Sequence, residues 1–142
     1  MESLKALFVD DETGYLETAV KRMKKRGIDV IGASSGTEAL ETLAAQAIHV
    51  VVMDVRMPGM DGIQALREIR QRYPLVEVIL LTGHASMEVA IQGMESGAFD
   101  YLLKPIDIDE LIYKIQDAYK RRQIQTKKIE TIEKLRGGER EK

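Results

Sequence analysis

The sequence has 142 residues, a formal net charge of −2 and no cysteine. This length suits one domain with a sizeable core, and the small net charge provides no global basic field to attract nucleic acid. The missing cysteines exclude disulfides, thiol catalysis and thiolate metal sites. No signal peptide is recognisable, and no apolar run approaches the ~20 residues of a membrane span. We therefore expect a cytoplasmic domain that binds neither nucleic acid directly nor a membrane.

Five short apolar runs are predicted as strands. They are Leu4–Val9, Ile28–Ile31, Ile48–Met53, Val76–Leu81 and Tyr101–Leu103. The third run is nearly unbroken and rich in valine, which is typical of a strand buried on both faces. Pro58-Gly59 follows it closely, and this pair favours a turn because proline has no N–H for the sheet ladder.

A helix is predicted after each strand from apolar residues at helical spacing. The first runs from Thr13 through Arg26. The others begin at residues that can cap a helix, namely Ser35, Asp61, Ser86 and Asp107. Five alternations of strand and helix with short connections favour an α/β fold, with a parallel sheet and helices on both faces.

The composition changes after Tyr119, and we expect a domain over residues 1–121. Residues 122–142 are mostly Lys, Arg, Glu and Gln, with sparse apolar positions before Gly137-Gly138. This spacing is too thin for a sustained coiled coil. The simpler interpretation is an extension of the last helix that frays into a charged tail. The alternative is a linker or a dimer helix.

Reactive side chains follow the predicted strands at the points where they end. These residues are Asp10, Asp11, Asp54, Thr82 and Lys104. They should meet at one edge of the sheet, because parallel strands all point the same way. Neighbouring carboxylates repel one another, and a hard divalent cation relieves that repulsion. Oxygen ligands favour Mg²⁺, whereas zinc is disfavoured because the sequence has no cysteine and only two histidines, which lie far apart.

Asp54 is predicted to be the reacting group, since an aspartate beside a bound cation can act as a nucleophile toward phosphorus. Charge on the transferring oxygens would be neutralised by the cation and by Lys104. The Thr82 hydroxyl and the Gly83 N–H supply hydrogen-bond donors. Each residue type alone has an ordinary structural use at a strand end. Their joint placement favours the functional interpretation.

These motifs resemble those of the receiver domain of two-component response regulators, of which the chemotaxis regulator is one. The resemblance extends from Leu4 to about Arg121. It is carried by Val9-Asp10-Asp11-Glu12, Met53-Asp54-Val55-Arg56-Met57-Pro58-Gly59-Met60-Asp61-Gly62, Leu81-Thr82-Gly83 and Gly97-Ala98-Phe99-Asp100-Tyr101-Leu102-Leu103-Lys104-Pro105. It implies a flavodoxin-like (βα)5 fold, doubly wound, with a five-stranded parallel sheet of order 2-1-3-4-5.

The resemblance also implies the chemistry. Asp54 would accept a phosphoryl group from a phosphohistidine on a sensor histidine kinase or a phosphotransfer protein. Asp11, Asp54 and the backbone carbonyl of Arg56 would bind Mg²⁺ directly, with Asp10 acting mainly through water. The side chains of Arg56 and His84 would tune the lifetime of the phosphate.

Three further features follow from the resemblance. Thr82 and Lys104 would hold the phosphoryl oxygens, and Tyr101 would swing inward as Thr82 moves. The Lys104–Pro105 peptide bond would be cis, which only a bond preceding proline allows cheaply.

Phosphorylation would change a protein-binding surface and would not release a product from a substrate, so we expect a signalling phosphoacceptor and not an enzyme. The predicted surface comprises Ser86–Met94, Tyr101–Leu103 and Glu110–Tyr119. Its partner would be a downstream protein, an effector domain outside this sequence, or a second copy in a homodimer that forms on phosphorylation. The alternative function is a protein-interaction module of the same fold that works without phosphorylation.

Overall fold

The five predicted strands form one parallel sheet. The computed structural model describes residues 3–84 and 86–140. Its strands are β1 (Lys5–Val9), β2 (Asp29–Ala33), β3 (Val50–Met53), β4 (Glu77–Thr82) and β5 (Asp100–Leu103). They lie in the order β2-β1-β3-β4-β5, and each neighbouring pair is parallel. The expected strand order is confirmed.

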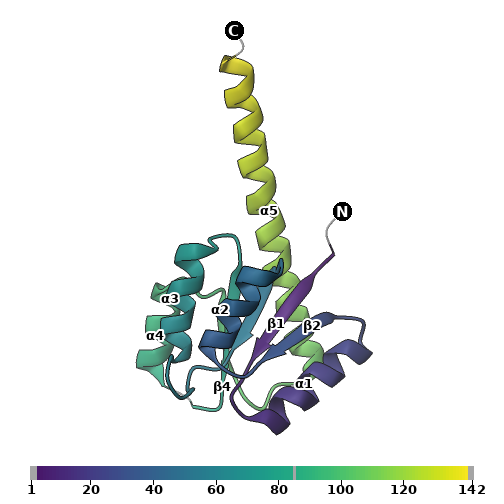
Figure 1. The fold of residues 1–142 in the computed structure, drawn as a ribbon, viewed down its shortest axis with the longest axis vertical. Helices are drawn as coiled ribbons and strands as arrows, with labels where there is room; N and C mark the ends of the chain where they lie inside the picture. The colour runs from purple at the N-terminus through teal and green to yellow at the C-terminus, as the bar shows by residue number, and fades with distance from the viewer. Residues whose placement is uncertain (1–2, 85, 141–142) are drawn as a thin grey trace.

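Helices cover both faces of this sheet (Figure 1). They are α1 (Thr13–Lys25), α2 (Gly36–Ala45), α3 (Gly62–Arg72), α4 (Met87–Glu95) and α5 (Ile108–Arg140). Side chains of α1 and α5 pack on one face, and those of α2, α3 and α4 pack on the other. Each of the helices α1 to α4 returns the chain to the start of the next strand, so all five strands end at the same edge. The doubly wound, flavodoxin-like fold class is confirmed.

The four predicted caps begin helices in the expected way. The side chains of Ser35, Asp61, Ser86 and Asp107 each accept a hydrogen bond from a backbone N–H in the first turn of the following helix. Such caps satisfy donors that the helix itself leaves unpaired, and each contributes about 1 kcal/mol.

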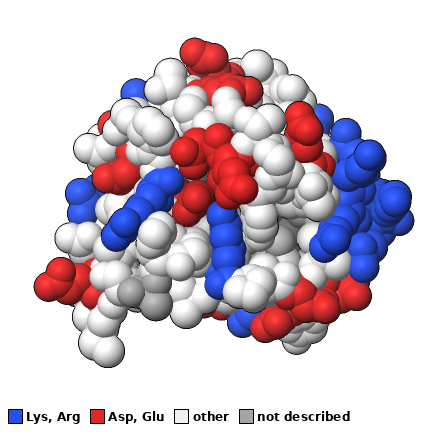
Figure 2. All heavy atoms as spheres, turned by 90° about the horizontal axis from the view of Figure 1, so that it is seen from below, with Lys and Arg blue, Asp and Glu red and all other residues white. Residues whose placement is uncertain are grey.

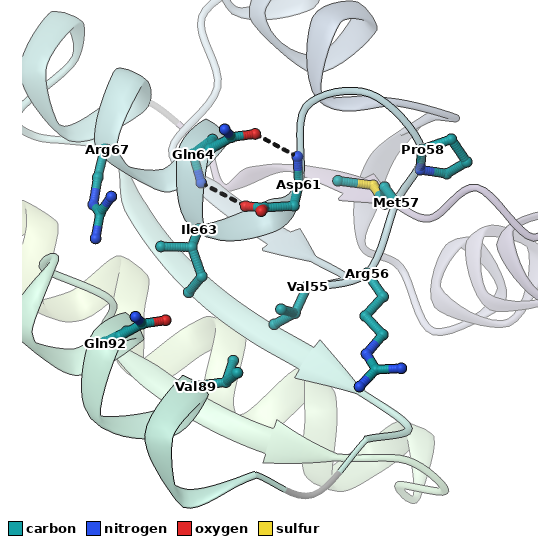
Figure 3. A pocket seen from close by; sticks show the side chains of 10 residues that line it. All are labelled: Val55, Arg56, Met57, Pro58, Asp61, Ile63, Gln64, Arg67, Val89 and Gln92. Atoms are coloured by element: carbon teal, nitrogen blue, oxygen red, sulfur yellow. Dashed lines mark hydrogen bonds between the residues drawn. The ribbon is translucent and has the colours of Figure 1, made fainter.

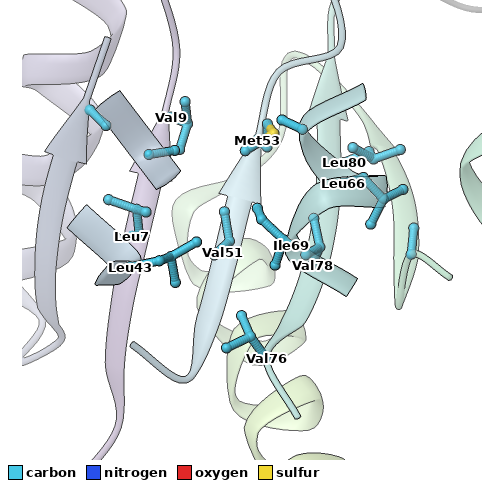
Figure 4. Close-up of a cluster of buried hydrophobic side chains, with 14 of the residues drawn as sticks. Leu7, Val9, Leu43, Val51, Met53, Leu66, Ile69, Val76, Val78 and Leu80 are labelled. Carbon is cyan, nitrogen blue, oxygen red and sulfur yellow. The ribbon is translucent and has the colours of Figure 1, made fainter. Parts of the chain in front are cut away.

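The sheet is buried on both faces, as its valine-rich strands predict. Leu7 and Val51 belong to the cluster under α2 and α3, which Figure 4 shows from close by. The next residues along the two strands, Phe8 and Val52, pack under α1 and α5 instead. Burying a side chain of this size contributes roughly 1.5–3 kcal/mol. This two-sided core fixes the positions of the strand ends.

The turn after β3 is closed by a glycine that has no room for a side chain. A Cβ atom on Gly62 would lie 2.2 Å from the carbonyl oxygen of Asp54 and 2.7 Å from the Cα of Val55. The Gly62 N–H donates a 2.7 Å hydrogen bond to the Val55 carbonyl. The loop therefore folds back tightly and holds Asp54 at the sheet edge.

The last helix, α5, is longer than its apolar pattern indicates. The pattern predicted packing through Tyr119 followed by an extension, and the described helix continues to Arg140 and projects from the body (Figure 1). The exposed large apolar residues of the projecting part are Ile124, Ile129, Ile132 and Leu135. Residues 120–136 are mainly good helix formers, which favours continuation. Residues 141 and 142 of the predicted tail lie outside the described residues.

None of the described helices is long and apolar enough to cross a bilayer.

Candidate functional site

Backbone hydrogen bonds continue past the ends of the strands and position the loops that carry the site. The N–H of Asp54 donates to the carbonyl of Val9 at 3.0 Å, and the N–H of Lys104 donates to the carbonyl of Thr82 at 2.8 Å. The backbone at Asp54 and Lys104 is therefore fixed by neighbouring strands. The Lys104–Pro105 peptide bond is cis.

The predicted acidic residues meet at this edge. One oxygen each from Asp10, Asp11 and Asp54 lie within 4.8 Å of one another. Asp10 is buried and Asp11 is exposed, while Asp54 lies between these extremes. Figure 2 views the molecule from the end opposite the tip of α5, and acidic side chains gather near the middle of that face. The cluster is accessible from solvent through Asp11.

Lys104 neutralises part of this charge. Its Nζ atom donates to Asp10 Oδ2 at 2.6 Å and to Asp54 Oδ2 at 3.4 Å, and its side chain is only 16% exposed. Burial alone would lower the pKa of Lys104, but the hydrogen bond and charge of Asp10, with the charge of Asp54, raise that pKa above its usual value. Lys104 is therefore held as a cation between two aspartates.

One oxygen of Asp54 is left for another ligand. Asp54 Oδ1 is buried and, among the described residues, has no hydrogen-bond partner. A buried carboxylate oxygen without a partner is costly, and such groups in native structures call for an explanation. A divalent cation held by oxygen ligands fits this position, because three carboxylates stand together and one of them keeps a free oxygen.

Thr82 and Tyr101 are connected through the loop after β4. Thr82 is fully buried, and its Oγ1 accepts a 3.2 Å hydrogen bond from the N–H of His84. The Tyr101 hydroxyl donates to the carbonyl of His84 at 2.9 Å, and the Tyr101 side chain packs partly against the core under α2 and α3. Gly83 is exposed, and a Cβ there would meet nothing within 4 Å. A side chain would therefore fit at this position, and the structure gives no steric reason for glycine there.

The two residues predicted to tune the site, Arg56 and His84, are both exposed. Arg56 lines a groove of about 670 Å³ between α3 and α4, together with Arg67, Ile63 and Val89. Figure 3 shows the Arg56 and Arg67 side chains at opposite ends of this groove. The Arg56 side chain is thus on the surface and lines this groove.

Tyr15 was missed by the sequence analysis. Its ring centroid lies 4.2 Å from the Nζ of Lys104. Burial raises the pKa of Tyr15, against the lowering effect of the Lys104 charge. The sequence held one signal for Tyr15: it is an aromatic residue in the first turn of the helix that follows the acidic loop. The contact itself joins residues far apart in the sequence and depends on side-chain geometry.

Comparison with known proteins gives the same picture. The family model of the response regulator receiver domain matches residues 6–116. The DNA-binding transcriptional regulator NtrC of Escherichia coli (strain K12) is 38% identical over 110 residues, which cover 78% of this chain and 24% of that protein. The regulatory protein AtoC of the same organism is 41% identical over 112 residues, covering 79% of this chain and 24% of that protein. The chain therefore spans only a minor part of the length of these relatives.

Solved structures agree. The crystal structure of a response regulator receiver domain protein from Clostridium thermocellum has a TM-score of 0.80 and 38% identity, and the match covers 87% of this chain and 99% of that one. The receiver domain of Francisella response regulator 1452 has a TM-score of 0.77 and 37% identity, covering 84% and 98%. From the matched motifs, the strand order and these similarities, the chain belongs to the response regulator receiver domain family.

Proposed function

We propose that this chain is the phosphoacceptor of a two-component system, and that Asp54 receives a phosphoryl group from a phosphohistidine on a sensor histidine kinase or a phosphotransfer protein. The observation that supports this most strongly is the free, buried Oδ1 of Asp54 beside the Asp10–Lys104 pair. Family membership supports the donor class.

In the proposed step, a bond forms between an Asp54 carboxylate oxygen and phosphorus, and the bond between phosphorus and the donor imidazole nitrogen breaks. That nitrogen keeps the electron pair, and the imidazole leaves in neutral form after taking up one proton. Lys104 already lies 3.4 Å from Asp54, so its charge is in place for the phosphoryl oxygens. The Thr82 hydroxyl and the Gly83 N–H are the nearby donors in the loop after β4.

Asp11, Asp54 and the Arg56 carbonyl would hold Mg²⁺, with Asp10 acting through water. Bound there, the ion would supply charge neutralisation for the transferring oxygens. The short bond between Asp10 and Lys104 shows that this carboxylate is already partly neutralised without metal.

Phosphorylation adds about −1.5 to −2 charges at the sheet edge. We infer that Thr82 is then drawn toward the new phosphoryl oxygens, which alters its bond with His84 and, through that loop, the bond between His84 and Tyr101. The Tyr101 side chain would move inward in response. This is a shift between two arrangements of one loop.

The surface that we propose for the partner consists of α4, β5 and the first part of α5. Its large apolar residues are exposed, which is characteristic of interaction sites. They are Met87, Ile91, Met94, Leu103 and Tyr113. We propose residues 1–121 as the receiver unit and residues 122–142 as a helical linker toward an effector domain or another target.

The experiment uses the full chain with acetyl phosphate and Mg²⁺, followed by intact-protein mass spectrometry. We expect a phosphoryl mass gain in the wild type and in a matched surface variant, Asp29→Ala, and none in Asp54→Ala. Equal mass gain in wild type and Asp54→Ala would remove the phosphoacceptor function from Asp54. Folded wild-type protein that gains no phosphoryl group would favour a phosphorylation-independent interaction module.

A further inference from the structure

The Lys104 ammonium has an aromatic neighbour in addition to its two carboxylates. Its Nζ lies 4.2 Å from the centroid of the Tyr15 ring, 2.6 Å from Asp10 and 3.4 Å from Asp54. A cation over an aromatic ring is attracted by the negative charge at the ring face, and the attraction increases when water is excluded. Lys104 is mostly buried, so this condition is met.

Tyr15 is itself held in place. Its ring is 6.1 Å from the ring of Phe8, which is 1% exposed in the core under α1 and α5. Tyr15 also forms one wall of a small cavity between α1 and α5, with Pro105 and Ile106 on the facing wall. Within the described part of the chain, the Tyr15 hydroxyl makes no hydrogen bond, so the contact with Lys104 is made by the ring.

A lysine needs such support because its four-carbon stem is flexible and its ammonium is a point charge without preferred direction. Asp10 alone would draw the ammonium away from Asp54, since the Asp10 contact is the shorter of the two. The ring borders the ammonium and takes up space that would otherwise admit water. It therefore restricts Lys104 to the region between the two carboxylates.

We propose that Tyr15 is a positioning residue, whose ring keeps the Lys104 ammonium directed at Asp54 for phosphoryl transfer. This inference rests on the proposed function of the site. Cation–π attraction of this kind corresponds to roughly a 3- to 30-fold change in an equilibrium constant.

The test compares Tyr15→Phe, which keeps the ring, with Tyr15→Leu, which keeps an apolar side chain but has no ring. For each full-length variant, the affinity for beryllofluoride with Mg²⁺ is measured by NMR, and the rate of phosphorylation by acetyl phosphate is measured by mass spectrometry. We expect Tyr15→Phe to stay within about twofold of wild type, and Tyr15→Leu to fall by roughly 3- to 30-fold in both. Tyr15→Met replaces Tyr15→Leu if the latter does not fold.

The same comparison in a Lys104→Met background separates positioning from a general structural effect. If Tyr15 acts through Lys104, Tyr15→Leu causes no further loss of beryllofluoride affinity once Lys104 is gone. An equal loss in both backgrounds would overturn the proposal, and so would Tyr15→Leu behaving as wild type.

A measurement without metal or phosphate keeps this inference distinct from the proposed function. The ring should shift the ε-methylene protons of Lys104 upfield in wild type and Tyr15→Phe, but not in Tyr15→Leu. If wild type shows this shift yet binds no beryllofluoride, the phosphoacceptor function fails while the contact stands. If wild type binds beryllofluoride and no ring-dependent shift is seen, the positioning role fails alone.

Discussion

Single residues set the charge balance of the site, and Lys104 is central to it. The structure places this lysine where it offsets the charges of Asp10 and Asp54. Without that cation, two carboxylates would face each other in a poorly solvated position, which is unfavourable. Lys104 therefore serves the metal-free protein as a counter-charge and the proposed reaction as a ligand for the phosphoryl group.

Replacing the lysine should make the fold depend on a divalent cation. We expect Lys104→Met to lower the free energy of unfolding by about 1–3 kcal/mol without metal, because Asp10 loses its charged hydrogen-bond partner. Adding Mg²⁺ should restore more stability to Lys104→Met than to wild type. Chemical denaturation with and without Mg²⁺ measures both effects. If Mg²⁺ raised the free energy of unfolding equally in wild type and Lys104→Met, the counter-charge role would be contradicted.

The raised pKa of Lys104 predicts a pH dependence with a definite sign. A lysine whose pKa is higher in the folded than in the unfolded chain stabilises the fold below its ordinary pKa of 10.5, and this contribution is lost as the pH rises through the folded value. The stability difference between wild type and Lys104→Met should be constant from about pH 6 to pH 9 and shrink above about pH 10.5. A difference that grows with alkaline pH would refute this assignment.

The sequence predicted that these residues share one edge of the sheet, because that prediction needed only strand direction. Asp10, Asp54 and Lys104 follow parallel strands and Thr82 ends one, so their shared edge is a consequence of topology. The contact of Tyr15 with Lys104 was not predictable, because a ring-to-ammonium distance depends on side-chain rotamers. The same holds for the bond from Tyr101 to the His84 carbonyl.

At the scale of elements, the loop from β3 to α3 controls where Asp54 lies. Its capping box, in which Asp61 and Gln64 exchange hydrogen bonds of 2.9 and 3.0 Å, fixes the start of α3 (Figure 3). Gly62 then lets the helix approach the Asp54 carbonyl closely. Asp61 was expected to cap a helix, but the tight backbone approach at Gly62 is visible only in the structure.

Gly62→Ala tests this loop. The added Cβ would clash with backbone atoms of Asp54 and Val55, so we expect a loss of roughly 1–3 kcal/mol in unfolding free energy and weaker beryllofluoride binding. Gly14→Ala in α1 is the matched control, since its Cβ meets nothing within 4 Å. Alanine there should be neutral or stabilise by about 0.5–1 kcal/mol. Equal stability of the two variants, measured by denaturation, would contradict the account of the loop.

The helix α5 is tied to the sheet at the point where it leaves the body. Arg121 pairs with the buried Glu77 at 2.8 Å and lies over the ring of Phe99, while Arg70 reaches Glu77 from α3. Burial raises the pKa of Glu77, and the two arginines act in the opposite direction. The spacing of apolar residues predicted that the last helix packs on the sheet as far as Tyr119. That spacing could not predict the ion pair between Arg121 and Glu77, because the two residues lie on different elements.

For the whole molecule, the site and the projecting part of α5 lie at opposite ends (Figures 1 and 2). Apart from Ala118, the buried hydrophobic residues of the domain lie within the region matched by the family model, and the exposed apolar residues of α5 follow it. Stability and phosphoryl chemistry should therefore both reside in the first part of the chain. The projecting part of α5 would then serve to connect the domain to an effector domain or to bind another target.

Truncation after Gln123 tests this division. It removes all four exposed apolar residues of the projecting part and keeps Arg121 inside α5. Because the lost side chains bury little surface, we expect the unfolding free energy to change by less than about 1 kcal/mol, with unchanged beryllofluoride affinity. Calorimetry and titration of the truncated and full chains provide the comparison. A truncated chain that is unfolded or fails to bind would show that the helix is part of the functional unit.

Borohydride trapping shows directly whether Asp54 becomes an acyl phosphate. Reduction of the phosphorylated chain converts the modified aspartate to homoserine, which peptide mass spectrometry locates. We expect homoserine at position 54, dependent on Mg²⁺ and a phosphodonor and absent when the metal is chelated. Homoserine at Asp10 or Asp11 instead, or unmodified Asp54 in folded protein treated with metal and donor, would show that Asp54 is not the phosphoacceptor.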